Sequence, residues 1–311
     1  MMFLHVLGVS MVQIRLRCWG ALCAALGLWL SALAPAQADV LEKIRASGSI
    51  TLAHRDASIP FSYLDQDKRP IGYSMDLCLK VVEAIRRELR LDRLEVKYLL
   101  VTPAARIAAI AEGQAVLECG STTNTAERRK SVDFTIAHFI SSSRLLTRTD
   151  AKLNAIDQLA TKTVVSTKGT TSLTMLRRVN DDLALKMNIV EAPDHGQAFA
   201  MVADGKATAF AMDDVLLFGL RANAPKPDDY QVIGKPLTME PYAIMLPKGD
   251  GAFKKLVDQE VRRVILSGEI NALYAKWFQQ PIPPKGINLS LPMSYLLKDS
   301  FKFPSDKVGD I

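Results

Sequence analysis

Short apolar runs alternate along the chain with longer segments in which apolar residues recur at helical spacing. The runs SGSITLAHR (47–55), LEVKYLLV (94–101) and AVLECGS (115–121) have the length of strands. Between them, YSMDLCLKVVEAIRREL (73–89) and PAARIAAIAEG (103–113) have the period of amphipathic helices. This order of strand and helix predicts a mostly parallel sheet that is covered by helices.

The same alternation begins again after about residue 143. The pattern there predicts strands at 163–169, 188–192 and 207–214, and helices at 170–179, 195–205 and 215–222. Two stretches share one pattern: AAIAEGQAVLECGS (108–121) and AMVADGKATAFAMD (200–213). In each, a predicted helix ends at an acidic residue and a glycine, and a strand that ends in polar residues follows. We therefore expect an α/β protein with two similar lobes rather than a short-period repeat.

Capping residues indicate where several helices begin. Ser74 and Asp194 are predicted N-caps, and Asn124 with Glu127 has the spacing of a capping box that opens a helix. Later segments predict a strand at 242–247 and helices at 253–268 and 269–280. Residues 287–311 are weakly periodic and are expected to wrap the surface.

The first 38 residues have the pattern of a secretory signal peptide. Arg15 and Arg17 precede an uncharged apolar run at 18–34, and Ala36 and Ala38 occupy the small-residue positions of a cleavage site. A membrane anchor is the alternative, but the run is slightly shorter than the roughly 20 residues that a spanning helix needs. We expect cleavage and export to the periplasm.

Charge and cysteine content narrow the possible partners. The formal net charge is +6, with Lys and Arg scattered rather than clustered, so a nucleic-acid partner is not expected. Cys18 and Cys23 lie in the signal segment, which leaves Cys78 and Cys119. An oxidising compartment permits a disulfide between them, but their apolar surroundings favour two buried free thiols.

Polar loops follow the predicted strands at HRDAS, CGSTT, STKGTTS and AMDD. Ligands bind at the carboxyl ends of strands in open α/β sheets, so these loops are expected to line one cleft. Ser121 and Thr123 with Arg128 suit a carboxylate, because helix-start N–H groups and a guanidinium favour anions. Asp213 ends an apolar strand, and burial there requires a partner, for which we expect a cation.

Sequence signals for catalysis, metals and cofactors are weak. His54, His138 and His195 do not have metal-ligand spacing, and the sequence contains neither a CxxC motif nor a glycine-rich phosphate loop. The HRD triplet at 54–56 lacks the Asn that a kinase catalytic loop would carry five residues later. We therefore expect no cofactor, no metal and no enzymatic activity.

The segments CGSTTNTAERRKSVDFT, DHGQAF and AMDD resemble those of the solute-binding proteins of polar amino-acid ABC transporters, in particular the glutamate/aspartate-binding subfamily. The resemblance runs from about Ile44 through PIPPKG (281–286). It implies a two-lobed type II periplasmic binding protein with two hinge crossings, with lobe 1 at 39–143 plus 240–286 and lobe 2 at 144–239. The implied partners are an inner-membrane permease and its ATPase, with the binding protein itself a monomer by default.

Residue by residue, the resemblance implies two groups of ligand contacts. Arg128, Thr123 and Thr171 would hold an α-carboxylate, and Ser121 and Asp213 an α-ammonium. Three further side chains would face a second carboxylate, which implies glutamate or aspartate: Arg55, Arg106 and His195.

One segment departs from the subfamily, which usually has TSQNR where this chain has TPAAR (102–106). Pro103 replaces a side-chain hydroxyl near the distal carboxylate, which leaves the glutamate-to-aspartate preference open. A second hypothesis, based on the same fold, is an enzyme that resembles periplasmic cyclohexadienyl dehydratases. Such an enzyme needs a general acid, for which the sequence offers no clear candidate.

Overall fold

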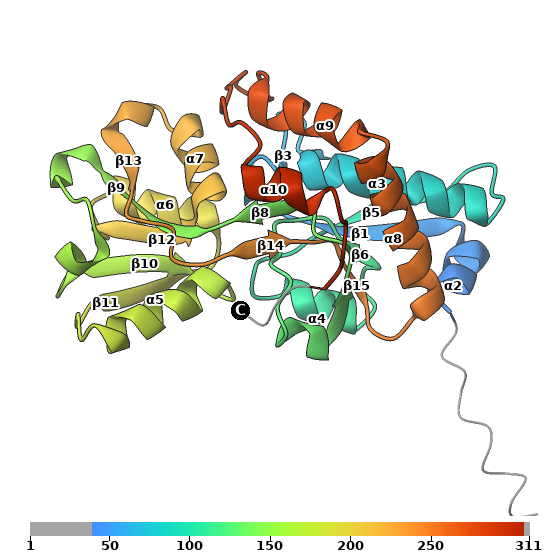
Figure 1. Cartoon of the computed structure of the whole chain (residues 1–311), viewed down its shortest axis with the longest axis horizontal. Helices are drawn as coiled ribbons and strands as arrows, with labels where there is room; N and C mark the ends of the chain where they lie inside the picture. The colour runs from blue at the N-terminus through green and yellow to red at the C-terminus, as the bar shows by residue number, and fades with distance from the viewer. Residues whose placement is uncertain (1–38, 308–311) are drawn as a thin grey trace, which may run out of the picture. The chain divides into compact units, whose positions relative to one another are not determined.

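Two mixed β-sheets, each in its own lobe, form the frame of the fold (Figure 1). The computed structural model describes residues 39–307, so the predicted signal peptide lies outside the described residues. Residues from Val40 onward belong to one compact unit. Within the described range, no helix is both long enough and apolar enough to cross a membrane.

The first sheet has the strand order β5-β1-β6-β15-β7. β1 pairs in parallel with both β5 and β6, whereas β15 is antiparallel to β6 and β7. Ile50 lies opposite Val96 in this register. The strands are β1 (Ser49–His54), β5 (Glu95–Leu100), β6 (Leu117–Glu118), β7 (Val132–Phe134) and β15 (Met245–Pro247).

Helices cover both faces of the first sheet, with α3 on one side and α4 on the other (Figure 1). α8 packs along α3, and α9 continues into a π-helical turn, η6. The helices of this lobe are α2 (Val40–Ser47), α3 (Tyr73–Glu88), α4 (Arg106–Ala111), α8 (Gly251–Leu266), α9 (Glu269–Tyr274) and η6 (Ala275–Gln279). A small antiparallel sheet adds β2 (Ala57–Ser58), β3 (Ser62–Leu64) and β4 (Pro70–Ile71).

The second sheet repeats the arrangement of the first. Its order is β11-β10-β12-β9-β13, with β10 parallel to β11 and β12 and with β9 antiparallel to β12 and β13. The strands are β9 (Ser143–Arg148), β10 (Thr163–Thr167), β11 (Asn188–Ala192), β12 (Ala209–Asp213) and β13 (Tyr230–Ile233). The helices are α5 (Thr171–Asp182), α6 (His195–Ala203) and α7 (Asp214–Asn223), with short 3-10 turns η3 (Thr149–Ala151), η4 (Ile156–Leu159) and η5 (Pro227–Asp229).

The chain passes between the sheets through two short strands that pair with each other, β8 (Phe139–Ser141) and β14 (Glu240–Tyr242). Phe139 and Tyr242 of these crossings belong to a buried group of aromatic rings. The other members, whose centroids lie 4.3–6.4 Å from their neighbours, are Phe61, Tyr73, Tyr274 and Phe278. The crossings are thus anchored in the core of the first lobe.

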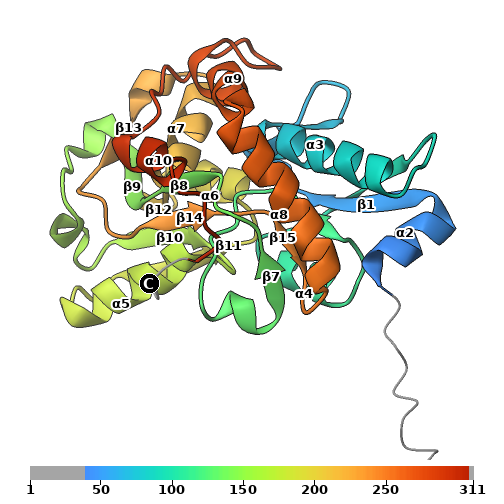
Figure 2. The same cartoon turned by 45° about the vertical axis from the view of Figure 1, so that its right-hand side comes forward.

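The C-terminal segment lies against the crossings. It contains one helix, α10 (Tyr295–Ser300), which contacts β8 and buries Leu297. The tail then reaches Asn124, whose side-chain amide donates to the Asp306 carbonyl oxygen at 3.4 Å. The turned view in Figure 2 shows α10 in front of the β8 and β14 region.

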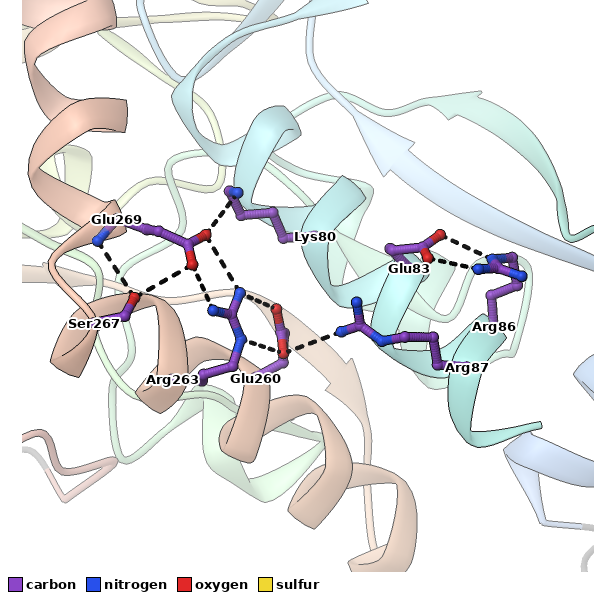
Figure 3. Close-up of polar contacts among 8 residues, drawn as sticks. All are labelled: Lys80, Glu83, Arg86, Arg87, Glu260, Arg263, Ser267 and Glu269. Atoms are coloured by element: carbon purple, nitrogen blue, oxygen red, sulfur yellow. Dashed lines mark hydrogen bonds and ion pairs between the residues drawn. The ribbon is translucent and has the colours of Figure 1, made fainter. Parts of the chain in front are cut away.

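A network of ion pairs joins α3 to α8 and α9 on the surface of the first lobe (Figure 3). Lys80 of α3 pairs with Glu269 at 2.8 Å, and Arg263 pairs with both Glu269 and Glu260. Arg87 approaches Glu260 at 3.8 Å. The pairs among the exposed members contribute little singly, whereas Glu260 is buried and accepts from two arginines of this network.

Several predicted elements agree with the structure. Asp194 caps α6, with its side chain accepting from the Gln197 N–H at 2.8 Å, and α3 and β10 lie where expected. The sheets, however, are less parallel than predicted, because β9 and β15, which follow the two crossings, run antiparallel to their neighbours on both sides.

Two capping predictions are wrong. Ser74 is not an N-cap: α3 begins after Gly72, and the Ser74 hydroxyl instead donates to the Gly120 carbonyl oxygen at 2.7 Å. Asn124 does not open a helix, because its N–H donates to Pro241 in the crossing strand. Only a short 3-10 turn, η2 (Arg128–Lys130), forms in this segment.

The preference for free thiols is also wrong. Cys78 and Cys119 form a disulfide with a Cα–Cα distance of 6.1 Å. Cys78 lies on the buried face of α3, and Cys119 directly follows β6 on the sheet that α3 covers. Both side chains are fully buried. The packing of α3 on the sheet buries both cysteines and also brings their two sulfur atoms together.

Candidate ligand-binding site

The carboxyl ends of strands from both sheets surround one small cavity. Its volume is about 10 Å³, which is about the room that one water molecule needs. Loops after β6 and β10, the end of β12 and the first residues of α4, α5 and α6 supply its walls. The lining residues are Arg106, Ser121, Thr123, Thr170, Thr171, His195, Met212, Asp213 and Leu216.

Six of the predicted site residues therefore line this cavity, and Arg55 and Arg128 lie outside its lining. Arg55 directly follows β1 and acts electrostatically on both Arg106 and His195, so it is close to the same end of the cavity. Arg128 borders an open groove beside the cavity, together with Thr123 and Thr171.

Arg55 is fully buried, and none of its three guanidinium nitrogens has a hydrogen-bond partner among the described residues. Burial and the nearby charge of Arg106 lower the pKa of Arg55 to about 9. Arg106 is 3% exposed, and its Nε also has no partner in the described part of the chain. Burial likewise lowers the pKa of Arg106.

His195 is the first residue of α6 and is 1% exposed. Its Nδ1 hydrogen-bonds with Thr167 Oγ1 at 2.9 Å, whereas Nε2 has no partner among residues 39–307. Burial, followed by the charges of Arg55 and Arg106, holds the pKa of His195 well below its ordinary value. His195 is therefore neutral and offers a hydrogen bond rather than a third charge.

These unpartnered groups gather at one end of the site. A buried polar group without a partner costs about 1–3 kcal/mol, and more when it is charged. The guanidinium of Arg55, Nε of Arg106 and Nε2 of His195 together are suited to an anion with several acceptor oxygens, and a carboxylate meets that requirement.

Glu118 provides a counter-charge that sequence reasoning missed. It is fully buried in β6, and its charge acts favourably on both Arg55 and Arg106. Its Oε2 accepts from Thr122 Oγ1 at 2.7 Å, and its Oε1 has no partner in the described chain. The signal was present as a carboxylate inside an apolar run, AVLECG.

Arg128 joins the two lobes. It donates to the Thr123 carbonyl oxygen at 2.8 Å and to the Gly169 carbonyl oxygen at 3.3 Å. The first carbonyl lies in the loop after β6 and the second in the turn between β10 and α5. Burial and the charge of Arg106 lower the pKa of Arg128 to about 9.

Asp213 is held by hydroxyl groups in the described part of the chain. Its carboxylate accepts from Ser172 Oγ at 2.7 Å, from Ser143 Oγ at 3.2 Å and from the Tyr242 hydroxyl. Burial, with a smaller contribution from the charge of Glu240, raises the pKa of Asp213 to about 7. Hydroxyl donors thus satisfy this carboxylate within residues 39–307, and the expected cation, the α-ammonium of a ligand, stays a prediction.

Glu240 is the second site residue that sequence reasoning missed. It lies in β14, is 2% exposed and borders the groove beside the cavity. One oxygen, Oε2, accepts from Thr123 Oγ1 and from Thr171 Oγ1, both at 2.7 Å. No sequence pattern distinguished it, because it stands in a short segment without clear periodicity.

In residues 39–307, no group of three or more His, Cys, Asp or Glu side chains is placed to hold a metal ion.

Residues 50–280 match the family model of bacterial extracellular solute-binding proteins, family 3. An L-glutamate/L-aspartate-binding protein of Pseudomonas aeruginosa is 51% identical over 282 residues, which cover 89% of this chain and 93% of the relative. A glutamate/aspartate import solute-binding protein of Escherichia coli is 42% identical over 274 residues, covering 88% and 91%.

Solved structures share the fold at lower identity. An ancestral arginine-binding protein bound to arginine superposes with a TM-score of 0.67 at 20% identity, covering 74% of this chain and 98% of the other. A solute receptor for L-cysteine of Neisseria gonorrhoeae superposes with a TM-score of 0.66 at 22% identity, covering 76% and 92%. These similarities indicate the type II periplasmic binding protein fold and leave the ligand open.

Proposed function

This chain belongs to family 3 of the bacterial extracellular solute-binding proteins, and on that premise we propose that it is the substrate-binding component of an ABC importer for glutamate or aspartate. The ligand would bind between the two lobes, whose contacts with it shift an open–closed equilibrium. The protein would then deliver it to an inner-membrane permease with its ATPase.

The observation that carries this proposal is the group of unpartnered donors from Arg55, Arg106 and His195. A neutral amino-acid side chain would leave two buried guanidinium groups with Glu118 as their nearest counter-charge and with unused donors, which is costly. A second carboxylate on the ligand would pair with both. Relatives with 51% and 42% identity, named for glutamate and aspartate, support the same choice.

The remaining contacts follow from the same placement. Arg128 would hold the α-carboxylate, and Ser121 and Asp213 would hold the α-ammonium. By the resemblance, Thr123 and Thr171 would assist Arg128, and both line the cavity. We further propose the lobe boundaries 39–143 plus 240–286 and 144–239, export by a cleaved signal peptide at 1–38, and a monomer.

The alternative of a cyclohexadienyl dehydratase is not supported. The relatives reported above are named as binding or import proteins.

Thermal unfolding of the ligand-stripped protein with a panel of amino acids tests the proposal. A ligand at a thousandfold over its dissociation constant stabilises the folded state by about 4 kcal/mol. We expect glutamate or aspartate to raise Tm and glutamine, asparagine, arginine, histidine and prephenate to leave it nearly unchanged.

Arg128→Ala serves as the matched site variant in the same experiment, because it should abolish the shift with every amino acid. A shift with prephenate alone would favour the enzyme. A shift with a neutral or basic amino acid alone would contradict the assignment of Arg55, Arg106 and His195.

A further inference from the structure

Glu240 binds hydroxyl groups from both lobes with a single oxygen atom. Oε2 accepts from Thr123 Oγ1 and Thr171 Oγ1, both at 2.7 Å. Thr123 follows β6 of the first sheet, whereas Thr171 begins α5 beside the second sheet. Glu240 itself lies in β14, one of the two crossings, so it stands where the lobes meet.

Both bonds have the same direction, and that direction limits what the threonines can offer a ligand. A threonine hydroxyl has one hydrogen, and the carboxylate of Glu240 accepts it in each case. Only the lone pairs of the two hydroxyl oxygens then remain available. A ligand group that meets these oxygens must therefore donate a hydrogen bond.

We propose that Glu240 is a positioning residue that directs the lone pairs of Thr123 and Thr171 into the cavity, where they bind the α-ammonium of the ligand rather than its α-carboxylate. Both threonines line the cavity together with Asp213, so the three side chains form one group of acceptors. The inference rests on the proposed function. It changes one expected contact, because the resemblance assigned Thr123 and Thr171 to the α-carboxylate.

The α-carboxylate is then left to other donors. Arg128 is one, since it lies beside Thr123 and borders the same groove as Thr171. The N–H groups that open α5 before Leu173 are the others, because the first turn of a helix has amide hydrogens without intrahelical acceptors; the Leu173 N–H itself donates to Thr170 Oγ1. Donors and acceptors thus separate cleanly around the ligand.

This separation predicts discrimination against ligands that lack the ammonium group. Glutarate keeps both carboxylates of glutamate but has no donor for the acceptor group. A site built to hydrogen-bond a ligand group rejects the analogue that lacks it by up to about 10⁴-fold. We therefore expect wild-type protein to bind glutamate at least a hundredfold more tightly than glutarate.

Calorimetric titration of Glu240→Gln with L-glutamate and with glutarate tests the inference. The amide of glutamine can donate as well as accept, so at least one threonine hydroxyl loses its fixed direction. We expect the dissociation constant for glutamate to rise tenfold or more while that for glutarate stays the same or falls. Glu260→Gln is the matched control, because Glu260 is also a buried carboxylate but lies on α8, away from the cavity.

Thr123→Val and Thr171→Val provide a second measurement that does not depend on Glu240→Gln folding. Each should weaken glutamate binding and spare glutarate, because valine removes an acceptor for the ammonium. In the double variant Glu240→Gln/Thr171→Val, the loss of glutamate binding free energy should be smaller than the sum of the two single losses, since Glu240 acts partly through that hydroxyl.

The possible outcomes separate the two proposals. Equal losses for glutamate and glutarate in Glu240→Gln, or no change for either, would overturn the inference alone. A loss of glutarate binding in the threonine variants as large as that of glutamate would overturn it too. Wild-type protein that binds no acidic amino acid would overturn the proposed function and this inference with it.

Discussion

At the scale of single residues, we expect the buried guanidinium groups to decide ligand class. Arg106→Ala should weaken glutamate binding by about 10- to 100-fold, because it removes hydrogen bonds to a charged group worth about 1.5–3 kcal/mol. Weak glutamine binding should change much less. Calorimetry with both ligands measures the difference, and Arg45→Ala, a half-exposed arginine of α2, is the control. Parallel losses for both ligands would argue against a distal carboxylate site.

His138 gives the protein a pH dependence that is independent of the ligand. It is fully buried between β7 and β8, and neither ring nitrogen has a partner among the described residues. Burial lowers the pKa of His138 to about 3. In the unfolded chain the pKa returns to about 6.5, so below pH 6.5 the unfolded state binds a proton that the folded state does not.

The free energy of unfolding should therefore decrease by roughly 2 kcal/mol between pH 7 and pH 5 through this group alone. His138→Leu should lose that part of the pH dependence, and urea unfolding of both proteins at several pH values measures it. Identical slopes against pH in the two proteins would show that His138 is protonated in the folded state or contributes nothing.

At the scale of elements, the disulfide ties α3 to the end of β6. It closes a loop with a sequence separation of 41 residues, for which chain entropy predicts a stabilisation of about 4 kcal/mol. Cys78→Ala/Cys119→Ala should lower the free energy of unfolding by about 2–4 kcal/mol in urea titrations. Wild-type protein under reducing conditions is the control and should lose a similar amount.

The same bond supports the site, because Gly120 and Ser121 directly follow Cys119. The Ser74 hydroxyl adds a second tie from α3 to this loop through the Gly120 carbonyl. The double cysteine variant should therefore also bind glutamate more weakly. Unchanged affinity in a clearly destabilised variant would show that the loop is held by the sheet alone.

Elements with strong local patterns could be predicted from the sequence, and elements defined by tertiary contacts could not. α3, α6, α8 and the central strands carry enough periodicity to place them within a few residues. The helix expected at Asn124 fails because its N–H bonds to a strand that is more than a hundred residues away. Short strands such as β2 and β8 contain too few residues to show a period.

The site residues also divide into those that the sequence could predict and those that it could not. The loops after strands, with their hydroxyls and arginines, could be assigned to a cleft from the order of elements and from the family resemblance. Glu118 and Glu240 could not, because the sequence does not show which hydroxyl a buried carboxylate will bond. The state of His195 follows from burial and from neighbouring arginines, neither of which the local sequence reveals.

At the scale of the whole molecule, closure depends on a near contact between α7 and the turn after β2. A Cβ atom on Gly219 would lie 2.4 Å from the Ile59 carbonyl oxygen, which is closer than any real contact of that kind. Gly219→Ala should therefore push the lobes apart and weaken glutamate binding, and it should raise the radius of gyration measured by X-ray scattering with ligand.

Gly251→Ala is the control for this change, because no atom lies within 4 Å of a Cβ placed there at the start of α8. Glutamate affinity that is equal in Gly219→Ala and in wild type would show that the ligand-bound protein keeps α7 and the β2 turn further apart.

The near-complete burial of the side chains around the cavity has a kinetic consequence. Arg106, Ser121, Thr123, His195 and Asp213 are each less than 5% exposed, so we expect a bound molecule to leave mainly when the lobes move apart. Escape of a bound molecule would then wait for the lobes to separate, and the opening rate would set an upper limit on dissociation. Two ligands that favour the same closed form would share one opening rate. If their affinities differ, they would differ in the fraction of openings that end in release.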